Sequence, residues 1–100
     1  MGQVEEDASF VVRSPHRTAV LQRLMEGAAI PAQIREETGQ EYSRITEAAN
    51  NLRKRDLIDL IVEEDTKRGR LYDTTERGEK AIQFMRDNGM LDSESTYSRR

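Results

Sequence analysis

The sequence of 100 residues contains no cysteine and only one histidine. The absence of cysteine excludes disulfide bridges, thiolate metal ligands and a cysteine nucleophile. A single histidine excludes a metal site built from several histidines of one chain. The sequence therefore predicts no metal centre and no disulfide-stabilised fold, and we expect no cofactor.

Apolar residues are also scarce, at 35% of the chain, and aromatic residues make up only 5%. No apolar run approaches the roughly 20 residues that cross a bilayer. The first residues, MGQVEEDASF, are acidic and lack the apolar stretch of a signal peptide. We therefore expect a cytoplasmic protein without a membrane partner. The length favours one small domain, whose thin core would suit completion by a second chain.

The net charge is −3, yet three cations gather in the stretch DTKRGRLYDTTERG, residues 65–78. Lys67, Arg68 and Arg70 surround one glycine, and like charges at this spacing repel one another unless an anion binds there. The negative net charge argues against a protein whose whole surface attracts nucleic acid, but binding depends on where the charges lie. The cluster therefore indicates a local anion-binding site. The alternative is an ordinary hairpin turn with surface ion pairs, which contribute little to stability.

Apolar periodicity and capping residues predict the order helix, helix, helix, hairpin, helix. The expected helices cover residues 14–26, 31–38, 42–55 and 75–88. Ser14 is a good N-cap, Pro15 and Pro31 suit first helical positions, and Gly39 suits a helix end. The segments LIDLIV and RLYDT, residues 57–62 and 70–74, read as two strands.

The two ends of the chain are expected to be flexible. Residues 1–9 read as a flexible acidic N-terminus, and residues 89–100, which include DSESTYSRR, as a flexible C-terminal tail. Residues 10–88 then form the single folded domain.

The helices at 31–38 and 42–55, joined through Gly39, have the outline of a helix-turn-helix. Tyr42 is expected to pack the latter helix against the turn. The helical repeat places Ile45, Ala48, Ala49 and Leu52 on one buried side. The opposite side carries Ser43, Glu47, Asn50, Asn51 and Lys54, with Arg44 and Arg53 on the flanks.

This outward face has the chemistry of a reader of the DNA major groove. Asparagine pairs with adenine edges, and arginine or lysine with guanine edges. Hydroxyl groups such as that of Ser43 reach phosphates or bases. The alternative is a plain solvated face, and Glu47 at its centre would repel phosphate. The strand, turn and strand that follow favour the first interpretation, because they add a wing.

The predicted fold is therefore mainly α with a small β-hairpin: a winged helix-turn-helix with a three-helix core, a β wing and a C-terminal helix. With the helix at 42–55 in the major groove, the wing at 64–70 would lie on the adjacent backbone or minor groove. Arginine is favoured in a narrow minor groove, where the potential is more negative.

The stretches SFVVRSPHRTAVLQRL, YSRITEAANNLRKRDLIDLI and GRLYDTTERGEKA resemble archaeal winged helix-turn-helix transcriptional regulators of the MarR-like and ArsR-like kind. The resemblance covers about residues 9–86, and it implies sequence-specific binding of duplex DNA by a homodimer. By position, it implies these DNA contacts: Ser43, Arg44, Glu47, Asn50, Asn51 and Lys54 on the recognition helix; Lys67, Arg68 and Arg70 on the wing; and Ser14 and Arg17 near a phosphate at the start of the helix at 14–26. The cysteine and histidine ligands of metal-sensing members are missing, so metal sensing is not implied.

The last predicted helix carries Ala81, Ile82, Phe84 and Met85, which spread beyond a narrow stripe. We expect Phe10, Ile82, Phe84 and Met85 to form a two-fold homodimer interface. The alternative is that these residues close the core of a single chain.

No catalytic set is visible, so we expect a protein that is not an enzyme. Ser14 and His16 are neighbours but lack a third partner for a triad. No phosphate-binding loop is present, and the sequence indicates no effector ligand. His16 reads as a surface histidine, with a phosphate contact as the alternative. The rival function is a winged-helix module that binds proteins and not DNA, which Glu47 and the negative total favour.

Overall fold

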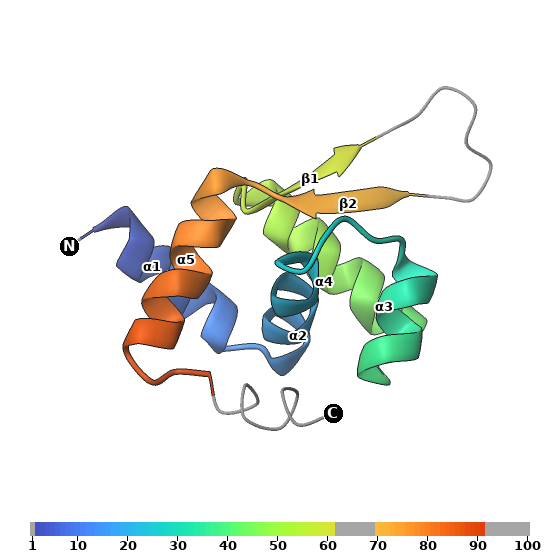
Figure 1. Cartoon of the computed structure of the whole chain (residues 1–100), viewed down its shortest axis with the longest axis horizontal. Coiled ribbons are helices and arrows are strands. Elements are labelled where there is room, and N and C mark those ends of the chain that lie inside the picture. Colours follow the sequence, from blue (N-terminus) through green and yellow to red (C-terminus); the bar gives the residue numbers. More distant parts are fainter. Residues whose placement is uncertain (1, 62–69, 92–100) are drawn as a thin grey trace.

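The structure is a computed structural model that describes residues 2–61 and 70–91. Its elements follow in the order α1 (Gln3–Val12), α2 (Pro15–Leu24), α3 (Pro31–Thr38), α4 (Tyr42–Lys54), β1 (Ile58–Ile61), β2 (Leu71–Thr74) and α5 (Glu76–Asp87). Figure 1 shows α2, α3 and α4 gathered under the hairpin, while α1 and α5 lie side by side at the other end. This arrangement confirms the predicted winged helix-turn-helix.

The N-terminal segment differs from the expectation of a flexible tail over residues 1–9. Gln3–Val12 forms α1, which packs mainly against α5. Ala8 and Val11 are fully buried, and so is Asp7. The acidic composition suggested solvation, whereas Asp7 is stabilised by arginines from distant parts of the chain.

The helix-turn-helix forms as predicted and is set by its turn. Gly39 ends α3 with φ of 76°, a left-handed conformation that glycine adopts without steric cost. Its backbone N–H donates to the Arg35 carbonyl at 2.9 Å. Beyond the turn, α4 buries Ile45, Ala48, Ala49 and Leu52 against α2 and α3, as the helical repeat predicted. The opposite face of α4 is exposed to solvent.

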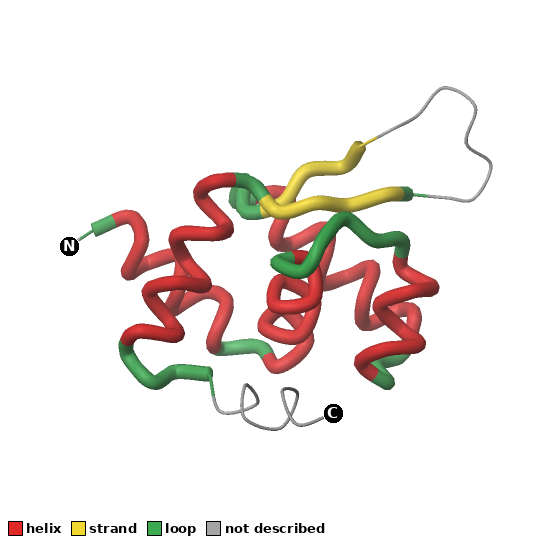
Figure 2. Tube along the Cα trace, in the orientation of Figure 1, coloured by secondary structure: helices red, strands yellow, loops and turns green. Residues whose placement is uncertain are grey.

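The hairpin pairs β1 with β2 in antiparallel register, with Ile58 opposite Thr74 and Leu60 opposite Tyr72 (Figure 2). Tyr72 is fully buried in the core. Ala29, just before α3, also exchanges two backbone hydrogen bonds of 2.9 Å with Tyr72. The base of the wing is therefore fastened to both the core and the chain that leads into α3.

The C-terminal helix starts where the sequence predicted. The Thr75 hydroxyl accepts from the Gly78 N–H at 3.0 Å and donates to the Asp56 carbonyl at 2.8 Å. Ala81, Ile82 and Met85 of α5 are fully buried in the main core. Among the described residues, no helix has the length and apolar character needed to cross a bilayer.

Candidate nucleic-acid interface

The outward face of α4 is exposed as the sequence predicted. Ser43, Arg44, Glu47, Asn50, Arg53 and Lys54 are exposed, while Asn51 is half-buried. The Arg44 and Glu47 side chains, 57% and 68% exposed, form a loose ion pair of 4.0 Å one turn apart. Glu47 therefore partly offsets a cation of its own helix, and the pair remains open to solvent.

The C-terminal half of this face is hollowed. Asn50, Arg53 and Lys54 line an open depression of about 280 Å³. It brings two cations beside an amide that can donate and accept hydrogen bonds at once. Such a group of side chains suits contact with a polar, anionic surface.

The base of the wing lies close to the start of α4. Arg70 is exposed, and the nearby hydroxyl of Tyr72 raises the pKa of the Arg70 guanidinium, with a smaller effect of Tyr42 in the same direction. Of the predicted wing at residues 64–70, the structure describes only Arg70. Lys67 and Arg68 lie outside the described residues.

Tyr42, which is expected to pack α4 against the turn, is largely exposed, with 56% of its surface open to solvent. It stands at the first position of α4, at the start of the exposed face of that helix. An aromatic residue at a helix start fits both packing and exposure, so the sequence pattern alone does not decide between them. Tyr42 is therefore part of the exposed surface at the start of α4.

A cavity of about 170 Å³ lies between the start of α2 and α4. It is lined by Ser14, His16, Arg17, Arg44, Glu47, Ala48 and Asn51. Ser14 caps α2 by accepting from the Arg17 N–H at 3.2 Å. The His16 Nδ1 is hydrogen-bonded to the Gln40 side-chain oxygen, so the turn of the helix-turn-helix holds the ring. The structure thus brings Ser14 and Arg17 together with part of the α4 face.

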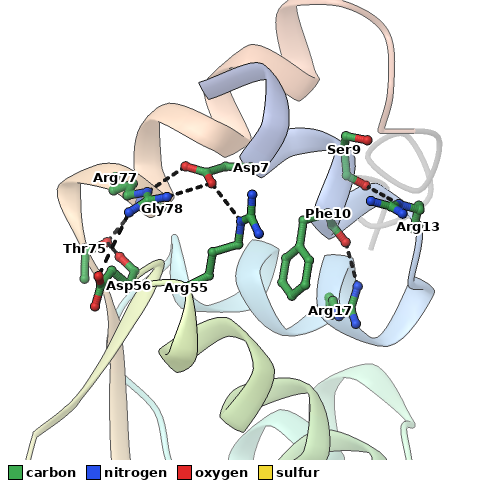
Figure 3. Close-up of polar contacts among 10 residues, drawn as sticks. All are labelled: Asp7, Ser9, Phe10, Arg13, Arg17, Arg55, Asp56, Thr75, Arg77 and Gly78. Carbon is green, nitrogen blue, oxygen red and sulfur yellow. Dashed lines mark hydrogen bonds and ion pairs between the residues drawn. The ribbon is translucent and has the colours of Figure 1, made fainter. Parts of the chain in front are cut away.

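Arg17 is more constrained than the sequence suggested. Its Nη1 donates to the Phe10 carbonyl at 2.8 Å, and its guanidinium stacks over the Phe10 ring at 3.9 Å from the centroid (Figure 3). Its Nε is buried and has no hydrogen-bond partner among the described residues. Arg17 therefore keeps one unused donor while α1 holds its orientation.

Asp7 forms a buried ion-pair cluster that the sequence did not predict (Figure 3). Its Oδ1 accepts from Arg55 Nε at 3.0 Å and its Oδ2 from Arg77 Nε at 2.7 Å. Burial alone would raise the pKa of Asp7, but the hydrogen bonds and charges of Arg77 and Arg55 lower it below the ordinary 3.8. The partners come from the end of α4 and the start of α5, so no local pattern reveals this cluster.

The predicted dimer residues fall into two groups. Ile82 and Met85 are fully buried in the core of the single chain, which is the alternative left open for them. Phe10 is half-buried beneath the guanidinium groups of Arg17 and Arg55. Phe84 is half-buried at the edge of the core on α5. Of the four, Phe84 keeps the most freedom to contact a second chain.

Within residues 2–61 and 70–91, no group of three or more histidine, cysteine, aspartate or glutamate side chains is arranged to hold a metal ion. Besides Glu47, the exposed face of α4, the wing base and the cavity beside α2 carry arginine, lysine, asparagine and serine side chains. These groups are donors for anions and for base edges.

No protein-family model and no curated protein matches the sequence. Solved structures do match in shape. The transcriptional regulator YodB from B. subtilis, in its reduced form, has a TM-score of 0.72 at 18% identity, covering 93% of each chain. A double mutant of ZitR from Lactococcus lactis has a TM-score of 0.63 at 24% identity, over 86% of this chain.

A mutant of MarR from E. coli, solved in complex with operator DNA, has a TM-score of 0.63 at 11% identity, covering 92% of this chain and 68% of that one. The chain spans only 58% of the length of ZitR. At these identities the comparisons establish the fold, which is the winged helix-turn-helix architecture that MarR also has.

Proposed function

We propose that this protein is a transcriptional regulator that binds duplex DNA sequence-specifically as a homodimer. The observation that carries the proposal is the division of α4, whose apolar side is buried while Ser43, Arg44, Asn50 and Lys54 are exposed together. The shape shared with a MarR mutant bound to operator DNA supports it. We propose further that the protein is cytoplasmic and has no catalytic activity.

In the proposed complex α4 lies in the major groove. Asn50 is suited to read an adenine edge, and Arg44 and Lys54 are suited to guanine edges or phosphates. The wing at residues 64–70, with Lys67, Arg68 and Arg70, would contact the adjacent backbone or minor groove. The start of α2, with Ser14 and Arg17, would anchor a phosphate.

The second chain is proposed to place a second α4 in the next major groove. A two-fold dimer would then span half-sites about 34–36 Å apart, one turn of the duplex. The partly exposed Phe84 on α5, beside α1, supports an interface at this end of the molecule. Figure 1 shows α3 at the opposite end of the molecule from α1 and α5, and α4 follows α3 directly in the chain, so an interface at α1 and α5 would leave the start of α4 free for DNA.

The test is fluorescence anisotropy with labelled duplexes from the region upstream of the protein's own gene, between about 50 and 200 mM salt. We expect tight binding to one fragment and a steep fall of affinity with salt. Asn50→Ala should weaken the preferred fragment by about 1–3 kcal/mol and relax the preference, whereas Lys54→Ala should weaken all fragments alike. Lys80→Ala, which removes an exposed cation of α5, is the matched control.

A triple substitution of Lys67, Arg68 and Arg70 by alanine tests the wing in the same assay. We expect lower affinity and a shallower salt slope, because fewer counterions are displaced. If this variant binds DNA with the affinity of the wild type, the wing is not part of the proposed interface.

The second candidate is a winged-helix module that binds a protein partner instead of DNA. Glu47, 68% exposed at the centre of the α4 face, and the net charge of −3 favour it. If the folded protein binds no duplex at any salt concentration, the regulator is rejected in favour of this protein-binding module.

A further inference from the structure

Glu47 is the only acidic residue of α4, and it lies near the middle of the exposed face of that helix. Its side chain is 68% exposed. At about 100° per residue, five polar side chains surround it: Lys54, Ser43 and Asn51 within about 40°, and Arg44 and Asn50 at about 60° on either side. In the proposed complex, a carboxylate therefore faces the duplex from the centre of the reading surface.

A carboxylate in this position opposes binding to most of a duplex. The phosphates repel it, and an ionised carboxylate can only accept hydrogen bonds. In the major groove, guanine O6 and N7, adenine N7 and thymine O4 are also acceptors, so only the amino groups of cytosine and adenine can donate to it. The adenine amino group lies between two acceptors, whereas that of cytosine has an acceptor on one side only. Cytosine is therefore the base that suits Glu47.

Arg44 supplies the complementary group one turn earlier on the same helix. Its Nη1 lies 4.0 Å from the Glu47 Oε1, and its side chain is 57% exposed. A guanidinium reads guanine through O6 and N7. Three residues advance an α-helix by about 4.5 Å, and successive base pairs are about 3.4 Å apart. With α4 running along the groove, the two side chains reach the same base pair or adjacent ones.

The ion pair between Arg44 and Glu47 can be exchanged for base contacts at little cost. An exposed pair of this length contributes little to stability. On a duplex with cytosine at the right position, both side chains exchange each other and water for base edges. On any other sequence Glu47 meets acceptors, and it loses hydration without gaining a donor.

We propose that Glu47 makes the protein selective for cytosine at one position of each half-site, while Arg44 contacts the guanine of the same or the adjacent base pair. The inference rests on the proposed function and deepens it, because it names the base that the central side chain of α4 reads. Glu47 acts mainly by weakening the binding of other sequences, which is a common source of specificity. A protein of net charge −3 then binds its own sites without binding DNA in general.

The first experiment selects bound duplexes from a pool with a randomised central segment and sequences them. We expect the wild type to enrich cytosine at one position of each half-site. Glu47→Ala should lose this preference and keep the preferences at the other positions. Glu79→Ala, which removes an exposed carboxylate of α5, is the matched control and should enrich the same sequences as the wild type.

The second experiment measures affinity by fluorescence anisotropy for an enriched duplex and for the same duplex with those C·G pairs replaced by T·A. The wild type should bind the enriched duplex about tenfold more tightly, as one base contact allows. Glu47→Ala should bind the two duplexes with nearly equal affinity. It should also bind the T·A duplex more tightly than the wild type does, because the repulsive carboxylate is gone.

This gain of affinity separates a role in selectivity from a structural role. A variant that had lost the shape of α4 would bind both duplexes more weakly, and circular dichroism checks that Glu47→Ala remains folded. The same change of affinity for both duplexes would overturn the inference.

The outcomes also separate this inference from the function on which it rests. Enriched duplexes without a preferred cytosine, or with the same cytosine for Glu47→Ala as for the wild type, overturn the role of Glu47 and leave the regulator intact. If the folded wild type enriches no duplex, the regulator is overturned, and the inference with it.

Discussion

Asp7 connects three elements through one buried carboxylate. It lies on α1, and it accepts hydrogen bonds from Arg55, which follows α4, and from Arg77 on α5. Its side chain is fully buried, whereas those of Arg55 and Arg77 are 34% and 32% exposed. The carboxylate thus depends on its partners for solvation, while the two arginines keep access to water.

Asp7→Asn is expected to destabilise the protein by about 1–3 kcal/mol, because it removes charge-assisted hydrogen bonds from a buried position. This loss of stability should be smaller than the loss on breaking a fully buried ion pair, because the two partly exposed arginines can be rehydrated. Urea unfolding at pH 7 measures it. Glu6→Gln, at the exposed neighbouring position, should change stability by no more than about 0.5 kcal/mol.

The lowered pKa of Asp7 gives this contribution a pH dependence. A carboxylate whose pKa is lower in the folded state stabilises the fold above its unfolded value of 3.8 and loses that effect as pH falls through the folded value. The difference in unfolding free energy between wild type and Asp7→Asn should therefore be constant above about pH 5 and shrink below about pH 4. A constant difference down to pH 2.5 would contradict the assignment.

The junction between α4, β1 and α5 is closely packed around Gly78. A Cβ at this position would lie 2.1 Å from the Leu57 carbonyl oxygen and 2.6 Å from the Thr74 hydroxyl. The same carbonyl accepts from the Thr75 N–H at 3.1 Å. The first turn of α5 can approach the start of β1 only because residue 78 lacks a side chain.

Gly78→Ala is therefore expected to destabilise the fold by about 1–3 kcal/mol, although alanine favours helices, because the added methyl overpacks a backbone contact. Thermal unfolding followed by circular dichroism measures the change. Gln83→Ala, at an exposed position of the same helix, should leave the midpoint nearly unchanged. A Gly78→Ala protein as stable as the wild type would show that α5 shifts freely against β1.

At the scale of the whole molecule, the core is completed within one chain by the packing of α1 on α5. Ile82 and Met85 belong to that core, so a dimer interface has to be formed by partly buried residues at the edge of the core. Phe84 is half-buried there, and Met90 just beyond α5 is also only partly buried.

We expect the wild type to sediment as a dimer at tens of micromolar and Phe84→Glu as a monomer, because a carboxylate would be buried at the interface without a partner. Circular dichroism of Phe84→Glu checks that the chain remains folded. Gln83→Glu adds the same charge at the exposed neighbouring residue and should remain dimeric. A monomeric wild type would contradict the proposed dimer.

The elements from α2 to α5 could be predicted from local patterns in the sequence. Ser14, Gly39 and Thr75 act at the predicted helix ends, and the stripe of Ile45 to Leu52 is buried as its spacing indicated. These features are local, because a cap or a helical repeat is complete within a few residues of the chain. The exposed face of α4 follows from the same repeat.

The other features depend on contacts between distant parts of the chain. The helix α1 replaces the expected flexible tail because Asp7 finds Arg55 and Arg77 at separations of 48 and 70 residues. His16 meets Gln40 across 24 residues, and the cavity beside α2 is lined by residues from both α2 and α4. Ile82 and Met85 are core residues of α5, the helix on which α1 packs. Each depends on a partner far away in the chain, and composition near the residue carries no information about that partner.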